Sequence, residues 1–403
     1  MTREEVNTKA LEKIDKVQVL IAQLATGFGK SKLSIDCINK LSDIKFKEYE
    51  EPLYVNIVVP TRALINNWQK ELDKWNCKTD LVDIKCYNSL AKMSPYADIT
   101  ILDEAHHLSE AKQQILLDML KVNPSMKIIV LSATLNRENI AFYKSLGSYE
   151  YIKCTTVDAI NDNVLPDPMI YLIPMELDNK ANTGQIIINP KKLDTIICSY
   201  NNMWQYKKRY PNKRIIVSCT QRQYYQDIDS KVEFYKRKFL VTRSEIMKNR
   251  WLRTAKDRLE WLAMQKNDIV NKITNRFEDQ RYVIFCANIK QSELLCNKSI
   301  TSKSNAMAIL KKFNDKKINH ISSCIILNEG HNLVDCRMGI FANLNGSEKL
   351  GIQRIGRTLR HEKPVLIVPF FKNTRDEEIV RKMFVGYNKE RIICTTNLSE
   401  IRL

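Results

Sequence analysis

The sequence lacks the features that would place it in a membrane, in a disulfide scaffold or around a structural zinc ion. No run of about 18 apolar residues occurs, which argues against a membrane-spanning helix. Residues 1–13 are charged throughout and have no apolar core of the signal-peptide kind, so we expect a cytoplasmic protein. The 11 cysteines include no Cys-x-x-Cys pair, and many lie in apolar runs. They therefore predict buried thiols in a reducing compartment and no zinc site.

Acidic residues are in short supply. The chain has 46 Asp and Glu against 64 Lys and Arg, a formal net charge of +18. Such a surplus is typical of proteins that contact nucleic acid phosphates or an anionic membrane surface, although a Lys-rich genome can produce the same bias. No amphipathic basic helix of the lipid-binding kind occurs at either terminus, so we do not expect a membrane partner.

Internal repeats and low-complexity tracts are also missing, and 403 residues are too many for one ordinary core. Short apolar runs alternate with amphipathic helical patterns, which predicts parallel α/β architecture. We therefore expect two lobes, at residues 1–155 and 156–403. Expected strands of the first lobe are residues 17–24, 54–60, 99–102 and 127–131, with helices at 31–41, 63–75 and 109–122. Expected strands of the second lobe are residues 282–287, 323–327, 339–343 and 364–369, with helices at 304–314 and 376–387.

Residues 182–281 differ from both patterns. They are rich in Tyr, Trp, Lys and Arg, and their periodicity predicts helices with a single strand at 214–219. We interpret this stretch as a helical elaboration of the second lobe. Its aromatic residues are typical of a buried core, but together with the basic residues they could also contact a nucleic acid strand. Residues 162–168, with two prolines and two aspartates, have the composition of a linker.

A glycine-rich turn follows the first apolar run and opens a helical pattern. Its two glycines allow backbone N–H groups to surround phosphate oxygens, and the helix N-terminus adds its dipole. The lysine supplies a charge to the β- and γ-phosphates and the serine hydroxyl a ligand to Mg²⁺. A plain structural turn is the alternative. The predicted nucleotide-binding residues are Ala25, Thr26, Gly27, Phe28, Gly29, Lys30 and Ser31.

Two adjacent carboxylates, Asp103 and Glu104, end the apolar run at residues 99–102. Magnesium is commonly held by one or two carboxylates together with phosphates and waters. We therefore predict that Asp103 holds Mg²⁺ with Ser31, and that Glu104 activates the attacking water. An Asp-Glu pair at a strand end can also be a simple helix cap.

An arginine-rich segment lies near the end of the second lobe. Arg357 and Arg360 are three residues apart, so both would project from one helix face towards a γ-phosphate. Gln353 lies on the same helix and could orient water or phosphate. A solvated helix face is the alternative.

The order of these motifs resembles that of superfamily 2 helicases of the DEAD/DEAH class, in particular phage helicases and the motors of restriction translocases. This resemblance spans residues 25–360 and implies two tandem RecA-like lobes. It implies that Gly330 and Asn332 lie near the nucleotide, and that three further residues couple nucleotide state to strand grip: His106, Ser132 and Thr134. It also implies nucleic acid contacts at Pro60, Thr61, Arg62, Asn88 and Asn288.

The sequence departs from the family pattern in two places. Leu24 stands where the strict phosphate-loop motif has glycine, and no upstream glutamine is positioned to read adenine.

The function that the resemblance implies is an ATP- and Mg²⁺-dependent helicase or translocase. We expect it to act on DNA, single-stranded or branched, in replication, recombination or repair, since only 43 residues follow Arg360 and no extra RNA-binding domain is evident. An RNA helicase, the motor subunit of a larger restriction or packaging complex with protein partners, and a nucleotide switch are the alternatives.

Overall fold

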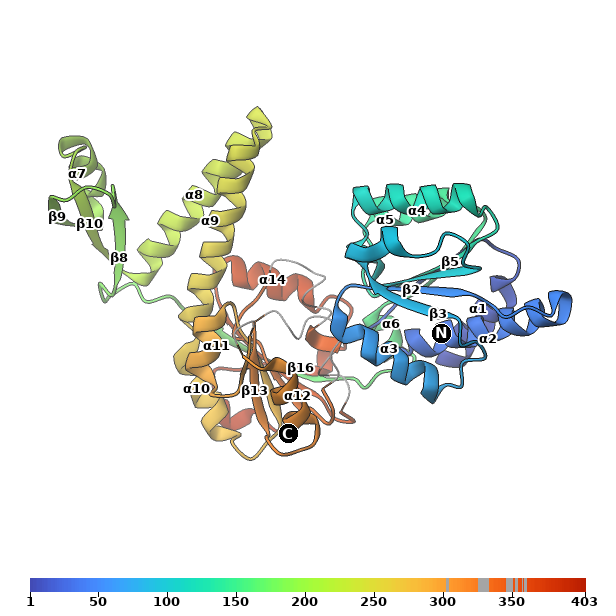
Figure 1. The fold of residues 1–403 in the computed structure, drawn as a ribbon. Helices are drawn as coiled ribbons and strands as arrows, with labels where there is room; N and C mark the ends of the chain where they lie inside the picture. The colour runs from blue at the N-terminus through green and yellow to red at the C-terminus, as the bar shows by residue number, and fades with distance from the viewer. Residues whose placement is uncertain (302–303, 325–332, 346–350, 352–353, 357, 359–360) are drawn as a thin grey trace.

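The computed structural model describes residues 1–403 except 302–303, 325–332, 346–350, 352–353, 357 and 359–360. Figure 1 shows two α/β lobes side by side, with a helical hairpin and a small separate sheet projecting from the second. Both large sheets are parallel, which confirms the expected fold class. No helix among the described residues is long and apolar enough to cross a bilayer.

The first lobe is a six-stranded sheet in the order β3-β2-β4-β5-β1-β6. Its central strands are buried on both faces, which explains why the sequence shows them as continuous apolar runs. The strands are β1 Val19–Leu24, β2 Val55–Val59, β3 Val82–Cys86, β4 Ile99–Asp103, β5 Lys127–Ser132 and β6 Tyr149–Cys154.

Helices cover both faces of this sheet (Figure 1). One face packs against α1, α2 and α3, and the other against α4 and α5. The helices are α1 Arg3–Ile14, α2 Lys30–Tyr49, α3 Arg62–Lys74, α4 Glu110–Val122 and α5 Arg137–Ser145. The short helix α6 (Thr156–Asn161) follows β6 and precedes the second sheet. Helix α1 begins with a capping box, in which Thr2 accepts from the backbone N–H of Glu5 and the Glu5 carboxylate accepts from that of Thr2.

The second lobe is a seven-stranded sheet in the order β12-β13-β11-β14-β15-β7-β16. Strand β7 pairs with β15 over its whole length, although most of the lobe separates them in sequence. The strands are β7 Met169–Met175, β11 Tyr282–Phe285, β12 Ser299–Ile300, β13 His320–Ser323, β14 Met338–Ile340, β15 Val365–Phe371 and β16 Ile392–Cys394. The helices are α10 Asn267–Arg276, α11 Ile289–Leu295, α12 Ala306–Asn314 and α14 Arg375–Met383.

Between β7 and α10 the chain builds two further units. Helices α8 (Gln221–Thr242) and α9 (Glu245–Met264) pack against each other as a long hairpin. Before it comes a unit that we call the minidomain (residues 182–220), with its own apolar cluster. Its elements are β8 Gly184–Ile188, β9 Thr195–Ser199, α7 Met203–Arg209 and β10 Arg214–Cys219.

The minidomain corrects one expectation. Residues 182–281 are not helical with a single strand, because β8 and β9 flank β10 in a three-stranded sheet. Strand β10 is buried on alternate residues, whereas β8 and β9 are largely exposed. Their short apolar runs at residues 186–188 and 196–198 were a signal for strands that the helical interpretation did not use. The strand expected at residues 323–327 is also displaced, since β13 ends at Ser323, and residues 325–327 lie outside the described part of the chain.

Candidate nucleotide site and nucleic-acid groove

The glycine-rich turn lies between β1 and α2, at the carboxyl edge of the first sheet. Gly27 (φ 88°) and Gly29 (φ 108°) both adopt left-handed backbone conformations, which a side chain would strain. Helix α2 begins at Lys30, so the turn leads directly into a helix N-terminus. The ammonium group of Lys30 donates to the carbonyl of Leu24 at 3.3 Å, across the mouth of the turn. This arrangement is suited to an anion held by backbone N–H groups and one lysine.

The carboxylate pair ends β4, two strands away from β1 in the same sheet. Both residues are buried, and Glu104 has a positive φ of 47° at the start of the turn that follows. Asp103 accepts hydrogen bonds from the indole N–H of Trp68 (2.9 Å) and from the backbone N–H of Glu104 (3.0 Å). Burial, and next the adjacent charge of Glu104, raise the pKa of Asp103 to about 6. A cation beside the pair would therefore stabilise it.

A polar chain links Glu104 to the end of the neighbouring strand β5. The Nδ1 atom of His106 lies 3.4 Å from Oε2 of Glu104 and 2.9 Å from the hydroxyl of Ser132. The Ser132 hydroxyl also accepts from the backbone N–H of Thr134 at 3.1 Å. The three residues that the resemblance assigns to coupling thus meet at one point beside the carboxylate pair.

Three buried oxygens in this region form no hydrogen bond with any described residue. They are the hydroxyls of Thr26 and Thr134 and Oε2 of Glu104. Unsatisfied buried oxygens are rare in folded proteins and call for a partner such as a ligand, water or ion. Together with the raised pKa of Asp103, they show that these residues fit a phosphate group and a hydrated divalent cation.

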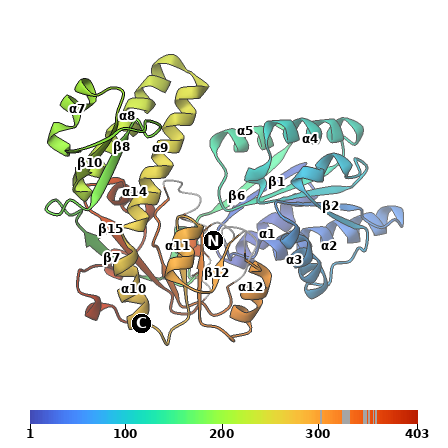
Figure 2. The same cartoon turned by 60° about the vertical axis from the view of Figure 1, so that its left-hand side comes forward.

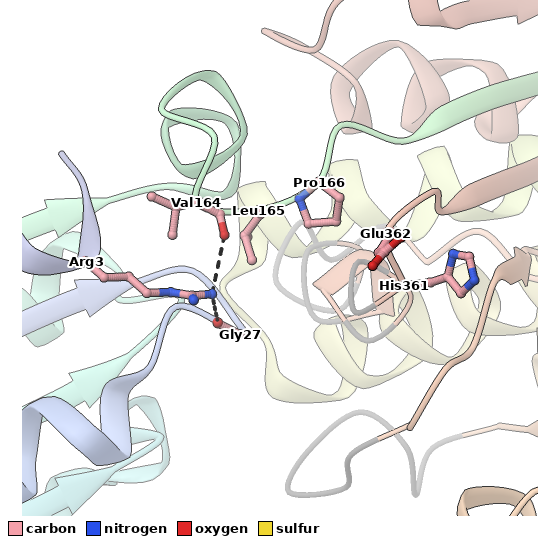
Figure 3. A pocket seen from close by; sticks show the side chains of 7 residues that line it. All are labelled: Arg3, Gly27, Val164, Leu165, Pro166, His361 and Glu362. Atoms are coloured by element: carbon pink, nitrogen blue, oxygen red, sulfur yellow. Dashed lines mark hydrogen bonds between the residues drawn. The ribbon is translucent and has the colours of Figure 1, made fainter.

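Arg3 is a residue that the sequence analysis missed. Its guanidinium group donates to the carbonyls of Gly27 and Val164, each at 3.3 Å, and so joins the glycine-rich turn to the segment after α6. Figure 3 shows these contacts in a pocket of about 370 Å³, whose far side is formed by His361 and Glu362 of the second lobe. Nothing in the charged first helix distinguishes Arg3, because the contact depends on how distant segments fold together.

The second lobe approaches the glycine-rich turn through the helix of the arginine-rich segment. A Cβ placed on Gly356 would lie 2.6 Å from Cβ of Thr26, so only glycine allows this approach. Arg354 on the same helix is fully buried and donates to the carbonyls of Asn343 (3.0 Å) and Cys324 (3.3 Å). Arg354 therefore ties the helix to the carboxyl ends of β14 and β13, a role with no signal in the sequence beyond the motif itself.

Five predicted site residues of the second lobe lie outside the described part of the chain. They are Gln353, Arg357, Arg360, Gly330 and Asn332.

Four of the five predicted nucleic-acid contacts line one groove on the first lobe. The groove has a volume of about 580 Å³ and lies between the start of α3 and the segment after β3. Its lining includes Pro60, Thr61, Arg62 and Asn88. Asn288 lies elsewhere, at the N-terminus of α11, where its side chain caps the helix through the N–H of Gln291 and donates to Glu260.

Comparisons with known proteins agree with this arrangement. Residues 265–362 match the model of the helicase conserved C-terminal domain. No curated protein matches the chain significantly.

Three solved structures share the fold. The Hef helicase domain of Pyrococcus furiosus is 13% identical over 94% of this chain and 97% of its own, with a TM-score of 0.51. Dbp5 of S. cerevisiae, solved with RNA and ADP–BeF3, is 12% identical over 97% and 89%, with a TM-score of 0.60. A fragment of a putative HsdR subunit of a type I restriction enzyme from Vibrio vulnificus is 14% identical over 98% and 66%, with a TM-score of 0.56. Identities this low show a common fold.

Proposed function

We propose that this chain is a superfamily 2 DEAD/DEAH-type helicase that hydrolyses ATP to move along or open DNA. The two-lobed fold and the match of residues 265–362 to the helicase C-terminal domain support this proposal. One observation carries the proposal. The glycine-rich turn and the buried Asp103–Glu104 pair share the carboxyl edge of the first sheet, and the second lobe's helix contacts that turn at Thr26. Phosphoryl transfer depends on such positioning of charge around the phosphates.

We assign the reaction to the residues of this edge. Lys30 and the backbone of residues 25–29 would hold the β- and γ-phosphates, and Ser31 with Asp103 would hold Mg²⁺. When bound, this cation would supply positive charge beside the phosphate oxygens. Glu104 orients a water molecule and accepts its proton through the carboxylate oxygen that has no hydrogen-bond partner. His106 then transmits the state of Glu104 to Ser132 and Thr134.

The lobes, which we place at residues 1–155 and 156–403, enclose the nucleotide between them. Arg357, Arg360 and Gln353 would complete the site from the second lobe, with Gly330 and Asn332 beside the nucleotide. Arg354 fixes the helix of the arginine-rich segment, which we call the arginine-bearing helix, to the carbonyls of Asn343 and Cys324. Nucleotide binding draws the lobes together and product release lets them part, which shifts the grip on the strand.

We place the strand in the groove on the first lobe, where Arg62 and the N-terminus of α3 contact phosphates. Phosphate contacts supply affinity without reading sequence, as a motor on varied DNA requires. Asn288 would contribute from the second lobe only if its capping bond opens. We place this activity in the cytoplasm, that of the host if the protein is viral.

Steady-state ATP hydrolysis with Mg²⁺ tests the proposal, measured alone and with single-stranded DNA, forked DNA or RNA. We expect DNA to stimulate hydrolysis, and Lys30→Ala and Glu104→Gln each to lower it by about 10²–10⁴-fold. Lys32→Ala is the matched control, because Lys32 lies two residues further along α2 and forms an ion pair with Asp36.

The outcomes separate the competing functions. Stronger stimulation by RNA than by DNA would make the chain an RNA motor. Hydrolysis absent with every polymer would replace the motor with a switch or with one subunit of a larger machine.

A further inference from the structure

The minidomain carries positive charge that no described residue neutralises through an ion pair. It has seven Lys and Arg side chains against a single carboxylate, Asp194. None of the seven forms an ion pair with a described residue: Lys191, Lys192, Lys207, Lys208, Arg209, Lys213 and Arg214. The neighbouring hairpin is better balanced, since residues 221–264 carry 11 Lys and Arg against six Asp and Glu. Three of its lysines, Lys231, Lys236 and Lys248, pair with a carboxylate on their own helix. The minidomain therefore presents unbalanced charge suited to an external polyanion.

An aromatic platform accompanies this charge on α7. Trp204 is 69% exposed, although its ring is among the largest apolar side chains of the minidomain. Lys207, one turn further along α7, lies with its ammonium group 4.9 Å from the centre of the Trp204 ring. Arg209 and Lys213 lie in the same way against the ring of Tyr210. An exposed aromatic ring edged by cations is the arrangement that stacks on a base and holds its phosphate.

The core of the minidomain does not need these side chains. Its apolar cluster is formed by other residues, among them Ile186, Met203, Ile215 and Val217, which are buried. Helix α7 contributes Met203 to that cluster and leaves Trp204, Lys207 and Lys208 exposed. Packing therefore does not explain why a tryptophan lies at position 204.

The surface is separate from the nucleotide site and from the groove on the first lobe. Figure 1 shows the minidomain standing apart from both large sheets, and the turned view of Figure 2 keeps α7 away from α3. The groove lined by Pro60, Thr61 and Arg62 belongs to the other lobe. One strand that occupied both surfaces would have to extend well beyond the groove.

We propose that the exposed face of α7, formed by Trp204, Lys207, Lys208 and Arg209, is a second binding surface for single-stranded nucleic acid. It holds the part of the strand that lies outside the motor groove, by contacts to phosphates and by base stacking on Trp204. The inference rests on the proposed function, because it takes the motor's own track as its ligand.

Length-dependent binding of fluorescent oligonucleotides to the full chain tests the surface. The probes are single strands of about 10 nucleotides, the order of one binding site, and of about 40 nucleotides. For K207E/K208E/R209E we expect at least about tenfold weaker binding of the long probe and unchanged binding of the short one. The slope of log affinity against log salt for the long probe should fall by about 2, since three phosphate contacts are lost.

Lys311, Lys312 and Lys317 provide the control. They are exposed at and after α12, on the opposite end of the second lobe from the minidomain (Figure 1). The variant K311E/K312E/K317E changes the net charge by the same amount, so it corrects for the general loss of positive field. A long-probe affinity and salt slope equal to this control's would overturn the proposal, and would leave the minidomain as a site for a protein partner.

Single substitutions at Trp204 guard against misfolding of the triple variant. Trp204→Ala should weaken the long probe about tenfold and Trp204→Phe should retain most of its binding. Equal binding by both would remove stacking from the proposal and overturn it in this form. ATP hydrolysis without nucleic acid should be the same in all these variants as in the unsubstituted chain. If the unsubstituted chain itself does not hydrolyse ATP, that result counts against the proposed motor function and not against this surface.

Discussion

The two lobes bury charge of opposite sign and use it differently. In the first lobe the buried charges are the acids Asp103 and Glu104, and one oxygen of Glu104 forms no hydrogen bond with any residue in the described part of the chain. In the second lobe they are chiefly the bases Lys266 and Arg354, already bound to Asp376 and to strand carbonyls. The two acids are suited to binding a cation, whereas the two bases join parts of the second lobe to one another.

This difference explains how two lobes of the same fold type can have different roles, one in catalysis and the other in holding structural elements in position. An uncompensated buried charge costs free energy, so it persists where function needs it. A buried cation beside a counter-ion or carbonyl oxygens costs less and fixes geometry. This holds although Nζ of Lys266, which is ion-paired with Asp376, and Nε of Arg354 form no hydrogen bond with a described residue. Burial lowers the pKa of Arg354 to about 10, and its bonds to the carbonyls of Asn343 and Cys324 hold it against the second sheet, two residues before the contact of Gly356 with Thr26.

Breaking the buried ion pair of the second lobe should have the largest effect on stability. Lys266 and Asp376 are fully buried 2.7 Å apart, and they join the end of the hairpin to the start of α14. Lys266→Met leaves the Asp376 carboxylate without its counter-ion, which should lower the free energy of unfolding by about 3–5 kcal/mol. Urea unfolding measures this loss.

Two further variants isolate the cause. Lys311→Met removes an exposed lysine and should change stability by no more than about 0.5 kcal/mol. The double variant K266M/D376L removes both charges and should recover part of the loss, although the N–H of Phe371 then lacks its acceptor. No recovery in the double variant would assign the loss to packing.

The contact between the lobes gives the next largest effect. Gly356→Ala places a Cβ against Thr26, so the arginine-bearing helix must withdraw from the glycine-rich turn. A displacement near 1 Å at a catalytic site can cost about 10²-fold in rate, and we expect hydrolysis to fall by that order. Gly351→Ala, five residues earlier in the chain, is the control, because among the described residues its Cβ would meet only Met383, at an ordinary 3.7 Å.

Urea unfolding should show whether a fall in hydrolysis by Gly356→Ala comes from lower stability or from a poorer fit between the lobes. If Gly356→Ala unfolds at the same urea concentration as Gly351→Ala, the loss of hydrolysis lies in the fit between the lobes. Normal hydrolysis by Gly356→Ala would show that the lobes do not need this close approach.

The sequence predicted the strands of the first lobe where burial is complete. Strands β1, β2, β4 and β5 are continuous apolar runs, so their positions and the carboxylates at the end of β4 follow from composition. Strand β3 was missed because it is an edge strand of half-buried residues that include Asp83 and Lys85. Strand β6, the opposite edge, also mixes charged and apolar residues.

Contacts between distant segments could not be predicted in the same way. Arg3 reaches Val164, Trp68 reaches Asp103, and Lys266 reaches Asp376, and none of these pairs has a local signal. Tertiary packing alone creates such pairs, which is why the candidate site was predicted by its motifs and not by its supporting residues.

The smallest expected effect tests whether burying Asp103 beside Glu104 lowers the free energy of unfolding. In the ligand-free chain burial, and next the charge of Glu104, raise the pKa of Asp103 from its usual 3.8 to about 6. Between these pH values the folded state binds more protons than the unfolded state, so this contribution to stability is full below about pH 4 and is lost as pH rises through about 6. Glu104→Gln removes the neighbouring charge, lowers the pKa of Asp103 and so reduces the loss.

We therefore expect Glu104→Gln and the unsubstituted chain to be equally stable at about pH 4, and Glu104→Gln to be more stable by about 1 kcal/mol at pH 7.5. Urea unfolding of ligand-free protein at both pH values measures the difference. Glu12→Gln, an exposed glutamate of α1, should show no such change with pH. A gain that is the same at both pH values would mean that Glu104 does not act through Asp103, and the two acids would then not form one coupled pair awaiting a cation.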